Sequence, residues 1–144
     1  NVGNKAEQAI EVLTESPLAP SITDVLDDVF SANGKDGTGT VDTVFTADAT
    51  EGSFLQKLIV RPRGTNVASV LRVFLNNGST NATAANNALI AEATLTATTN
   101  SETAAIQGTE ISLNMPVPAG YKINVTLGTA VAGGYVVTAV AGDY

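Results

Sequence analysis

Hydrophobic and polar residues alternate in short segments from residue 39 onward. In 110–115, Ile, Leu and Met alternate with Glu, Ser and Asn, and in 121–127, Tyr, Ile, Val and Leu alternate with Lys, Asn and Thr. Such alternation gives a β-strand one buried and one solvated face. The pattern predicts strands at 40–47, 53–61, 67–76, 88–96, 108–115, 121–128 and 134–141.

Two of these segments, 53–61 and 67–76, are more continuously apolar and are interrupted by Lys57 and Arg72. We expect them to be inner strands. Short strands separated by turn residues predict an all-β fold, in which two antiparallel sheets pack face to face as a sandwich over 39–144. We expect the sandwich to be jelly-roll-like. An immunoglobulin-like sandwich and a closed barrel are alternatives that the periodicity does not exclude.

The N-terminal segment, residues 1–38, is expected to form an acidic arm and linker that prolines at 17 and 20 interrupt. After them, Ser21 and Asp24 have the spacing of a helix capping box, which predicts a helical turn or two. An extended arm, which would add an eighth strand, is the alternative. Because so short a helix is marginal in water, its apolar residues should pack on the sandwich, on another copy or on a partner. These residues are Ile22, Val25, Leu26, Val29 and Phe30.

The composition argues against catalysis. The chain has no Cys and no His, which excludes disulfides, thiolate nucleophiles, Cys-based zinc sites and histidine-dependent mechanisms. Asp27 and Asp28 are adjacent, so they point in different directions on a helix or a strand and do not form a hydrolytic pair. We expect no enzymatic activity and no cofactor. A weak surface calcium site at Asn33, Asp36 and Asp42 is an alternative for metal binding.

Charge is distributed unevenly along the chain. The net charge is −7, ten of the fourteen carboxylates lie in the first 51 residues, and four of the seven basic residues lie at 57–72. This acidity argues against binding of nucleic acid, and no apolar run is long enough to span a membrane. The charges could be solvated faces, or the acidic arm could lie on the bases of another copy or of a partner. Those bases are Lys57, Arg61, Arg63 and Arg72.

An unusual polar segment, NNGSTNATAANN at 76–87, separates two hydrophobic segments. Its side chains and backbone can hydrogen-bond to a partner, and it carries no charge that would have to be desolvated. A long loop in a compact domain is often functional. We therefore expect this loop to line a contact surface, with a solvated crossover between strands of opposite sheets as the alternative. The candidate contact residues are Asn76, Asn77, Ser79, Asn81, Asn86 and Asn87.

The chain resembles small β-rich virion proteins of tailed bacteriophages, in particular the decoration or cement proteins of the head. The resemblance covers about 39–144. It is carried by the stretches RPRGTNVASVLRVFLNNGSTNATAANNALIAEATL, MPVPAGYKINVTLGTA and GGYVVTAVAGDY. It implies a jelly-roll or related sandwich that assembles as a dimer or trimer on the outer capsid surface of the virion. There it would stabilise the head by bridging subunits of the major capsid protein.

A different class of function is compatible with the same kind of sandwich. The protein could be a receptor- or glycan-binding module of a tail fibre or head fibre. Such a module should present aromatic or carboxylate-lined pockets. This sequence, with four Phe, three Tyr and no Trp, barely supplies them.

Overall fold

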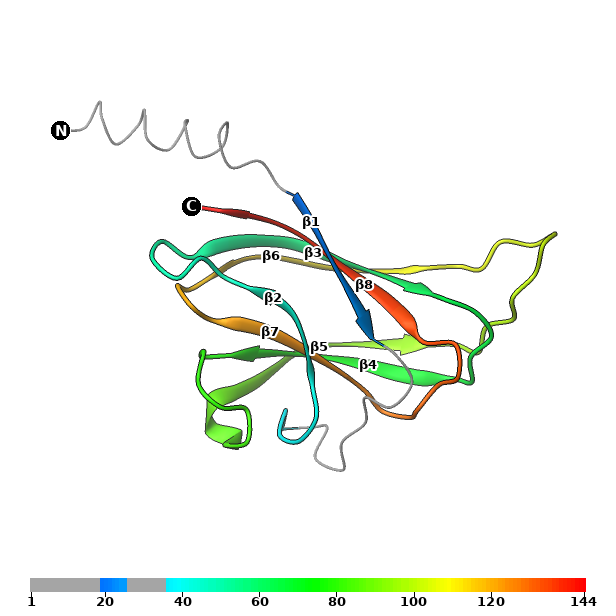
Figure 1. Ribbon diagram of the computed structural model, residues 1–144, viewed down its shortest axis with the longest axis horizontal. Coiled ribbons are helices and arrows are strands. Elements are labelled where there is room, and N and C mark those ends of the chain that lie inside the picture. Colours follow the sequence, from blue (N-terminus) through cyan, green and yellow to red (C-terminus); the bar gives the residue numbers. More distant parts are fainter. Residues whose placement is uncertain (1–18, 26–35) are drawn as a thin grey trace.

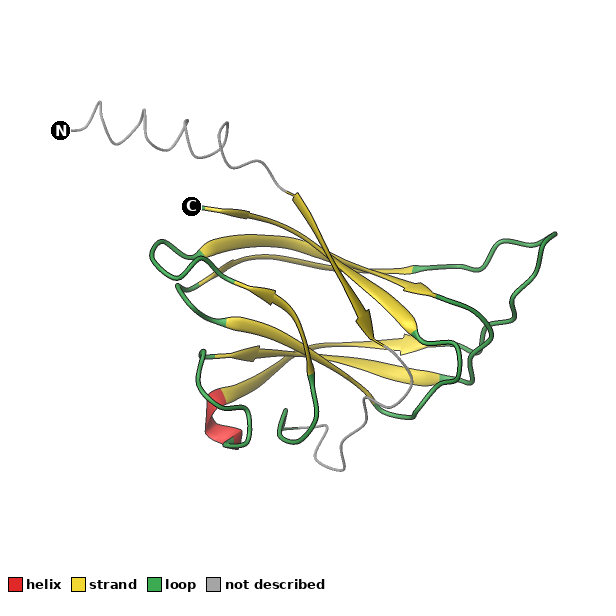
Figure 2. Ribbon diagram, viewed as in Figure 1, coloured by secondary structure: helices red, strands yellow, loops and turns green. Residues whose placement is uncertain are grey.

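The computed structural model describes residues 19–25 and 36–144. These residues form eight β-strands and one short 3-10 turn, η1, at Ala84–Asn86 (Figure 2). The strands are β1 Ala19–Val25, β2 Asp42–Thr46, β3 Ser53–Pro62, β4 Ser69–Asn76, β5 Asn87–Leu95, β6 Thr109–Val117, β7 Lys122–Leu127 and β8 Tyr135–Asp143. The seven strands predicted from the alternation are therefore confirmed, each with ends within about two residues of the prediction.

The strands form two four-stranded antiparallel sheets (Figure 1). One sheet has the order β1-β8-β3-β6 and the other β2-β7-β4-β5, and we call them sheet A and sheet B. Every connection between consecutive strands passes from one sheet to the other, except the connection from β4 to β5. Eight strands arranged in this way form a jelly-roll sandwich. The predicted all-β, two-sheet fold is confirmed, and β3 and β4 are inner strands as expected.

The helical turn predicted from Ser21 is wrong for the part of it that the structure describes. Residues 19–25 instead form β1, which pairs antiparallel with β8 from the pair Ala19–Ala141 to the pair Val25–Tyr135. Without β1, β8 would be an edge strand with unpaired backbone groups. Pairing with it satisfies backbone hydrogen bonds that a short helix would have to form alone. Leu26, Val29 and Phe30 lie outside the described residues.

The core lies between the two sheets and is built from the inward residues of alternating strands. In β8, Tyr135, Val137, Ala139 and Ala141 are buried, and the residues between them are half-exposed. The core side chains of sheet B follow the same alternation. They include Leu71 and Val73 of β4 and Ile123, Val125 and Leu127 of β7.

An irregularity in β3 explains why its sequence looked continuously apolar. The register of β3 with both of its neighbours shifts between Leu55 and Lys57. As a result, Leu55 and Leu58 are both fully buried although they are three residues apart, a spacing that regular alternation would not allow. Lys57 stays on the outer face, where its Nζ forms an ion pair with Glu110 of β6 at 3.0 Å.

Candidate functional site

The polar segment singled out in the sequence connects β4 and β5, which are neighbours in sheet B. The alternative that it crosses between opposite sheets is therefore wrong. Its first and last residues, Asn76 and Asn87, pair with each other at the ends of the two strands. We call the connecting residues 77–86 the asparagine loop. Figure 2 shows it, with its 3-10 turn, at one end of the sandwich.

Asparagine side chains hold this connection together. At its base, Asn76 Nδ2 donates to Asn87 Oδ1 at 2.8 Å, and Asn76 Oδ1 accepts from the backbone N–H of Gly78 at 2.8 Å. One residue further out, Asn77 Nδ2 donates to Asn86 Oδ1 at 3.1 Å. The two side-chain pairs reinforce the backbone pairing at the end of the ladder, where the Asn77 N–H also donates to the Asn86 carbonyl at 3.0 Å, so the loop begins from a fixed geometry.

Two asparagines also tie the loop to the residues that precede β2. Asn81 Nδ2 donates to the carbonyl oxygens of Gly37 and Gly39, at 3.0 and 2.8 Å. Asn87 Nδ2 donates to the carbonyl oxygens of Asp36 and Asn81, at 3.1 and 2.9 Å. Side-chain amides thus satisfy carbonyl groups that no strand ladder reaches. The order of the asparagine loop depends on a segment about 45 residues earlier in the chain.

That earlier segment, residues 36–39, is a tight turn, and we call it the glycine turn. Asp36 Oδ1 accepts from Thr38 Oγ1 at 2.7 Å and from the Thr38 backbone N–H at 3.0 Å. These bonds, the hydroxyl one above all, hold the pKa of the Asp36 carboxyl below its ordinary value. Gly37 has a φ of +75°, and a Cβ there would lie only 2.9 Å from Asn87 Cβ. Glycine permits both the turn and this close approach.

The glycine turn packs on an aromatic ring on the outer face of sheet B. Phe74 is fully buried but lies outside the core cluster, since it follows the core residue Val73 and consecutive strand residues point to opposite faces. A Cβ on Gly37 would lie 3.0 Å from Phe74 Cδ1. Burying a Phe side chain stabilises a fold by roughly 1.5–3 kcal/mol. This burial explains why β4 carries apolar residues on both of its faces.

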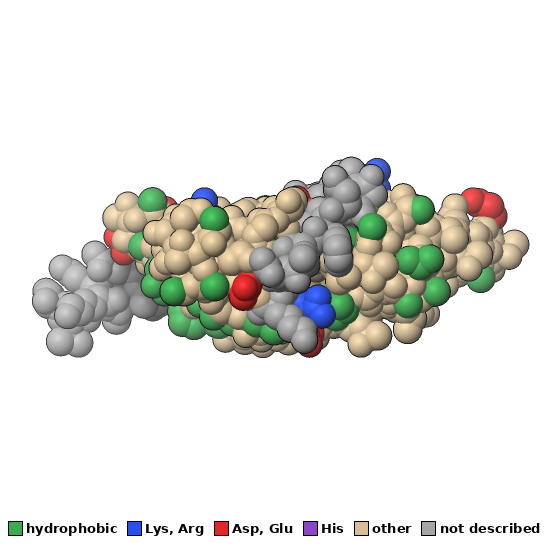
Figure 3. Space-filling view, turned by 90° about the horizontal axis from the view of Figure 1, so that it is seen from below, with side chains coloured by type: hydrophobic (Ala, Val, Ile, Leu, Met, Phe, Trp, Pro, Cys, Tyr) green, Lys and Arg blue, Asp and Glu red, His purple; other side chains and the backbone are tan. Residues whose placement is uncertain are grey.

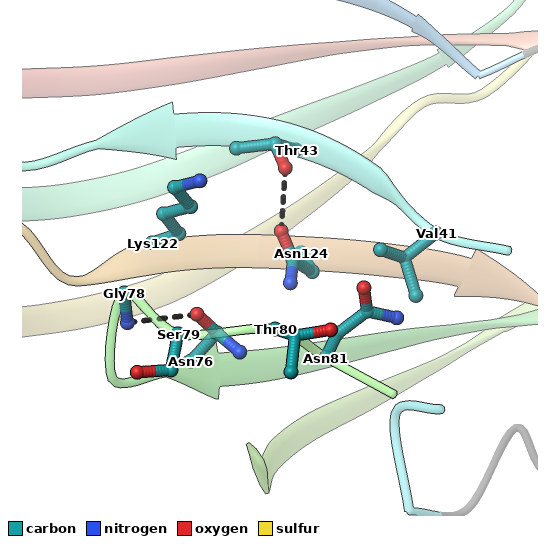
Figure 4. A pocket seen from close by; sticks show the side chains of 9 residues that line it. All are labelled: Val41, Thr43, Asn76, Gly78, Ser79, Thr80, Asn81, Lys122 and Asn124. Atoms are coloured by element: carbon teal, nitrogen blue, oxygen red, sulfur yellow. Dashed lines mark hydrogen bonds between the residues drawn. The ribbon is translucent and has the colours of Figure 1, made fainter. Parts of the chain in front are cut away.

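A pocket of about 190 Å³ opens beside the asparagine loop on the same face of sheet B (Figure 4). It is formed where the loop stands next to the start of β7 and the approach to β2. Its lining is almost entirely polar and contains neither an aromatic ring nor a carboxylate. The lining residues are Val41, Thr43, Asn76, Gly78, Ser79, Thr80, Asn81, Lys122 and Asn124.

Three of the lining residues present polar groups that no other described residue binds. Asn124 is only 3% exposed, and its Oδ1 accepts from Thr43 Oγ1 at 2.7 Å, which leaves its Nδ2 donor for the pocket. Asn81 uses both hydrogens of its Nδ2 on backbone carbonyls, so its Oδ1 remains an acceptor. Lys122 forms no ion pair within the described part of the chain. Figure 4 shows Asn124 pointing from β7 toward Thr80 and Asn81.

The candidate contact residues of the loop thus fall into two groups. The side chains of Asn76, Asn77, Asn86 and Asn87 are largely engaged with the loop itself, so they shape it. Ser79, whose Oγ binds no described residue, and Asn81, through its Oδ1, line the pocket. Figure 3 views the molecule from this side, and uncharged polar side chains and backbone make up most of what is visible.

The candidate basic residues do not form one surface, because β3 and β4 belong to different sheets. Arg61 is exposed on the outer face of sheet A, whereas Arg72 lies on the outer face of sheet B. Arg72 Nε also donates to Glu92 Oε1 of β5 at 2.9 Å, so its charge is already paired. Arg63 follows β3, where its backbone N–H donates to the Gly134 carbonyl. The four bases are therefore divided between the two sheets, and their contact with an acidic arm or a partner stays a prediction.

Of the apolar arm residues, the structure describes two, and both lie in β1. In the ladder with β8, Ile22 is opposite Thr138 and Val25 is opposite Tyr135. The pairing places this part of the arm on the sandwich of its own chain. Backbone pairing with β8 therefore fixes the position of residues 19–25, and an apolar helical face does not.

Sequence reasoning missed Thr43, Lys122 and Asn124 as site residues. Lys122 and Asn124 are polar positions of an alternating strand, and such positions normally face solvent. The only available signal was that the polar side of 121–127 contains a lysine and an asparagine two residues apart. Nothing in the sequence indicated that a loop 40 residues earlier would stand beside them.

In the part of the chain that the structure describes, no three His, Cys, Asp or Glu side chains gather where they could hold a metal ion. No helix in that part is long and apolar enough to cross a membrane. No protein-family model, curated protein or solved structure matches the chain. The geometry of the asparagine loop and its pocket is therefore the basis for assigning a function.

Proposed function

We propose that the protein is a structural component of a bacteriophage virion that binds the outer capsid surface and stabilises the head by bridging major capsid protein subunits. The observation that carries the proposal is the asparagine loop, an uncharged polar surface fixed in place by its own side chains. The sequence resemblance to decoration proteins and the jelly-roll topology, an architecture common among viral capsid domains, support it.

The construction of the loop suits a surface that binds another protein. Because Asn76, Asn81 and Asn87 already hold the loop, little conformational entropy is lost when a partner docks on it. The exposed groups are hydroxyls and amides, which cost less to desolvate than charges. Each contact is weak, but many copies on one shell, or two or three copies joined as an oligomer, turn weak contacts into durable attachment.

The proposal is tested by mixing purified protein with expanded capsids that lack it and sedimenting the shells. We expect saturation at a fixed ratio of bound copies to major capsid protein. Sedimentation of the protein alone checks the proposed dimer or trimer. Failure of the wild-type protein to bind any shell would contradict the capsid function and favour the fibre module, with host-surface glycans as the next ligands to try.

A matched pair of variants localises the contact. Ser79→Tyr adds a ring at the pocket without removing a side-chain hydrogen bond, whereas Thr99→Tyr adds the same ring on an exposed loop at the other end of the sandwich. We expect Ser79→Tyr to weaken shell binding at least tenfold and Thr99→Tyr to leave it unchanged. Equal binding by both variants would place the contact away from the asparagine loop.

A further inference from the structure

The pocket beside the asparagine loop contains more donors than the protein itself uses. Lys122 and Asn124 are two residues apart on β7 and therefore project from the same face, roughly 7 Å apart along the strand. Neither Lys122 Nζ nor Asn124 Nδ2 has a partner among the described residues. The hydroxyls of Ser79 and Thr80 line the same pocket.

Asn124 offers the pocket an unused donor. The residue is only 3% exposed and its amide nitrogen has no partner among the described residues, but this nitrogen is not one of the fully buried atoms that lack a partner, so it is accessible from the pocket. Because the hydrogen bond from Thr43 already holds the side chain, little conformational entropy is lost when the nitrogen donates to a ligand. The pocket measures about 190 Å³, several times the roughly 30 Å³ that one water molecule occupies in the liquid.

The charge of the lining selects the chemical class of the ligand. Lys122 supplies one positive charge, and no carboxylate in the lining neutralises it. A phosphate dianion is best held by paired cations or an Arg fork, which this pocket lacks. A sugar is best held with an aromatic ring to stack on, and the lining contains none. One cation flanked by neutral N–H and O–H donors matches a carboxylate.

We propose that the pocket binds a carboxylate, with Lys122 Nζ and Asn124 Nδ2 as its principal donors. In the virion the carboxylate comes from an Asp or Glu side chain of the protein on which the asparagine loop docks, and this identification of the source rests on the proposed function. The binding of carboxylate itself does not rest on that function and is measured on the isolated protein.

The first test titrates isotopically labelled full-length protein with acetate and follows the side-chain amide signal of Asn124 by NMR. We expect a saturable shift with a Kd on the order of 10 mM, as for one ion pair reinforced by hydrogen bonds to the charged carboxylate. Acetamide has the same shape without the charge and should cause less than a fifth of the shift. Equal shifts with acetate and acetamide would overturn the proposal.

Two lysine variants supply the matched comparison. Lys122→Gln should raise the acetate Kd at least fivefold, whereas Lys57→Gln, which removes a lysine already paired with Glu110, should leave it unchanged. Thermal unfolding of both variants checks that they are folded. An unchanged Kd in a folded Lys122→Gln protein would also overturn the proposal.

The shell-binding assay then separates the two proposals. If wild-type protein binds shells and Lys122→Glu binds at least tenfold more weakly, the partner supplies the carboxylate. If Lys122→Glu binds shells as well as wild type, a partner carboxylate in this pocket is excluded while the capsid function stands. If the wild-type protein binds acetate but no shells, the result contradicts the proposed capsid function and still supports the carboxylate-binding pocket.

Discussion

The asparagine loop and the longer loop at 96–108 are both rich in Ala and Thr, but they are held in different ways. The asparagine loop contains three Asn in ten residues, whereas the long loop contains one in thirteen, and the two loops lie at opposite ends of the sandwich (Figure 1). The asparagine loop folds back onto sheet B and the glycine turn. The long loop projects away from the body as a finger whose residues are mostly exposed.

The difference comes from what lies within reach of their side chains. In the asparagine loop, Asn81 and Asn87 donate to carbonyls of the glycine turn. In the long loop, Thr98 pairs with Asn66 and donates to the Gly64 carbonyl at 2.7 Å. Beyond Asn100, the hydrogen bonds found for the long loop join it only to itself.

The asparagine loop is therefore held by two features together, its Asn side chains and the backbone carbonyls of the glycine turn within their reach. The long loop has a single Asn and projects from the sandwich.

Gly37→Ala should damage the asparagine-loop end most, lowering the free energy of unfolding measured with urea by about 2–5 kcal/mol. The substitution combines a left-handed backbone, worth roughly 1–2 kcal/mol, with overpacking against Asn87 and Phe74, worth roughly 1–3 kcal/mol. Gly120→Ala is the matched control, since Gly120 has a φ of +76° but nothing within 4 Å of an added Cβ. Equal losses in the two variants would mean that the close packing at Gly37 is unimportant.

Asn87→Ala should cost about 2 kcal/mol, because it leaves the Asp36 and Asn81 carbonyls and the Asn76 amide without their partner. Asn100→Ala on the long loop should change stability by less than about 0.5 kcal/mol, because that side chain is exposed. Urea unfolding of both variants measures the contrast. If Asn100→Ala lowered the free energy of unfolding as much as Asn87→Ala, the two loops would not differ in how their side chains hold them.

Shortening the long loop should have a smaller effect. Replacing residues 101–105 with Gly-Gly removes bonds that the loop makes only to itself, and loop-closure entropy varies slowly with length, so we expect a change below about 1 kcal/mol. The measurement is the urea midpoint. A loss of several kcal/mol would show that the finger packs on the sandwich after all.

Acid should loosen the asparagine-loop end through Asp36. Hydrogen bonds from Thr38 lower the folded-state pKa of this carboxyl below 3.8, the ordinary value. Its contribution to stability is therefore complete well above pH 3.8 and is lost as pH falls through the lowered pKa. In Asp36→Asn, the free energy of unfolding should therefore fall slightly less than in wild type when the pH is lowered from neutral to acid. An equal fall in both proteins would contradict the role assigned to the Thr38 bonds.

The smallest effect is expected beneath the long loop, where Tyr135 lines a cavity of about 70 Å³ together with Thr98 and Gln107. The Tyr135 hydroxyl is buried and lies near the Asn66 side chain, but no hydrogen bond of good geometry joins them. Burial raises the pKa of Tyr135, and the nearby Asn66 side chain offsets part of this rise. Tyr135→Phe removes an unsatisfied group, so stability should stay the same or rise by up to about 1 kcal/mol. A loss above 1 kcal/mol in thermal unfolding would reveal a partner for the hydroxyl.

The candidate site was only partly predictable. The unusual composition of 76–87 identified the loop, but it did not show that Asn76 and Asn87 would face each other as partners. Lys122 and Asn124 join the site from a strand about 40 residues later. Basic residues that are close in sequence, such as Arg61 and Arg72, were separated, because consecutive strands of a jelly roll alternate between sheets.

By itself, the alternation of hydrophobic and polar residues determined where seven of the strands lie and which of their faces is buried, because side-chain period and burial are local consequences of the backbone. Only the tertiary structure decided that the arm contributes β1, that Phe74 is buried outside the core, and that Asn81 reaches Gly37. These outcomes depend on which backbone groups remain unpaired once the sheets have formed. The partners of these backbone groups come from distant segments, so they cannot be identified from one segment of the sequence at a time.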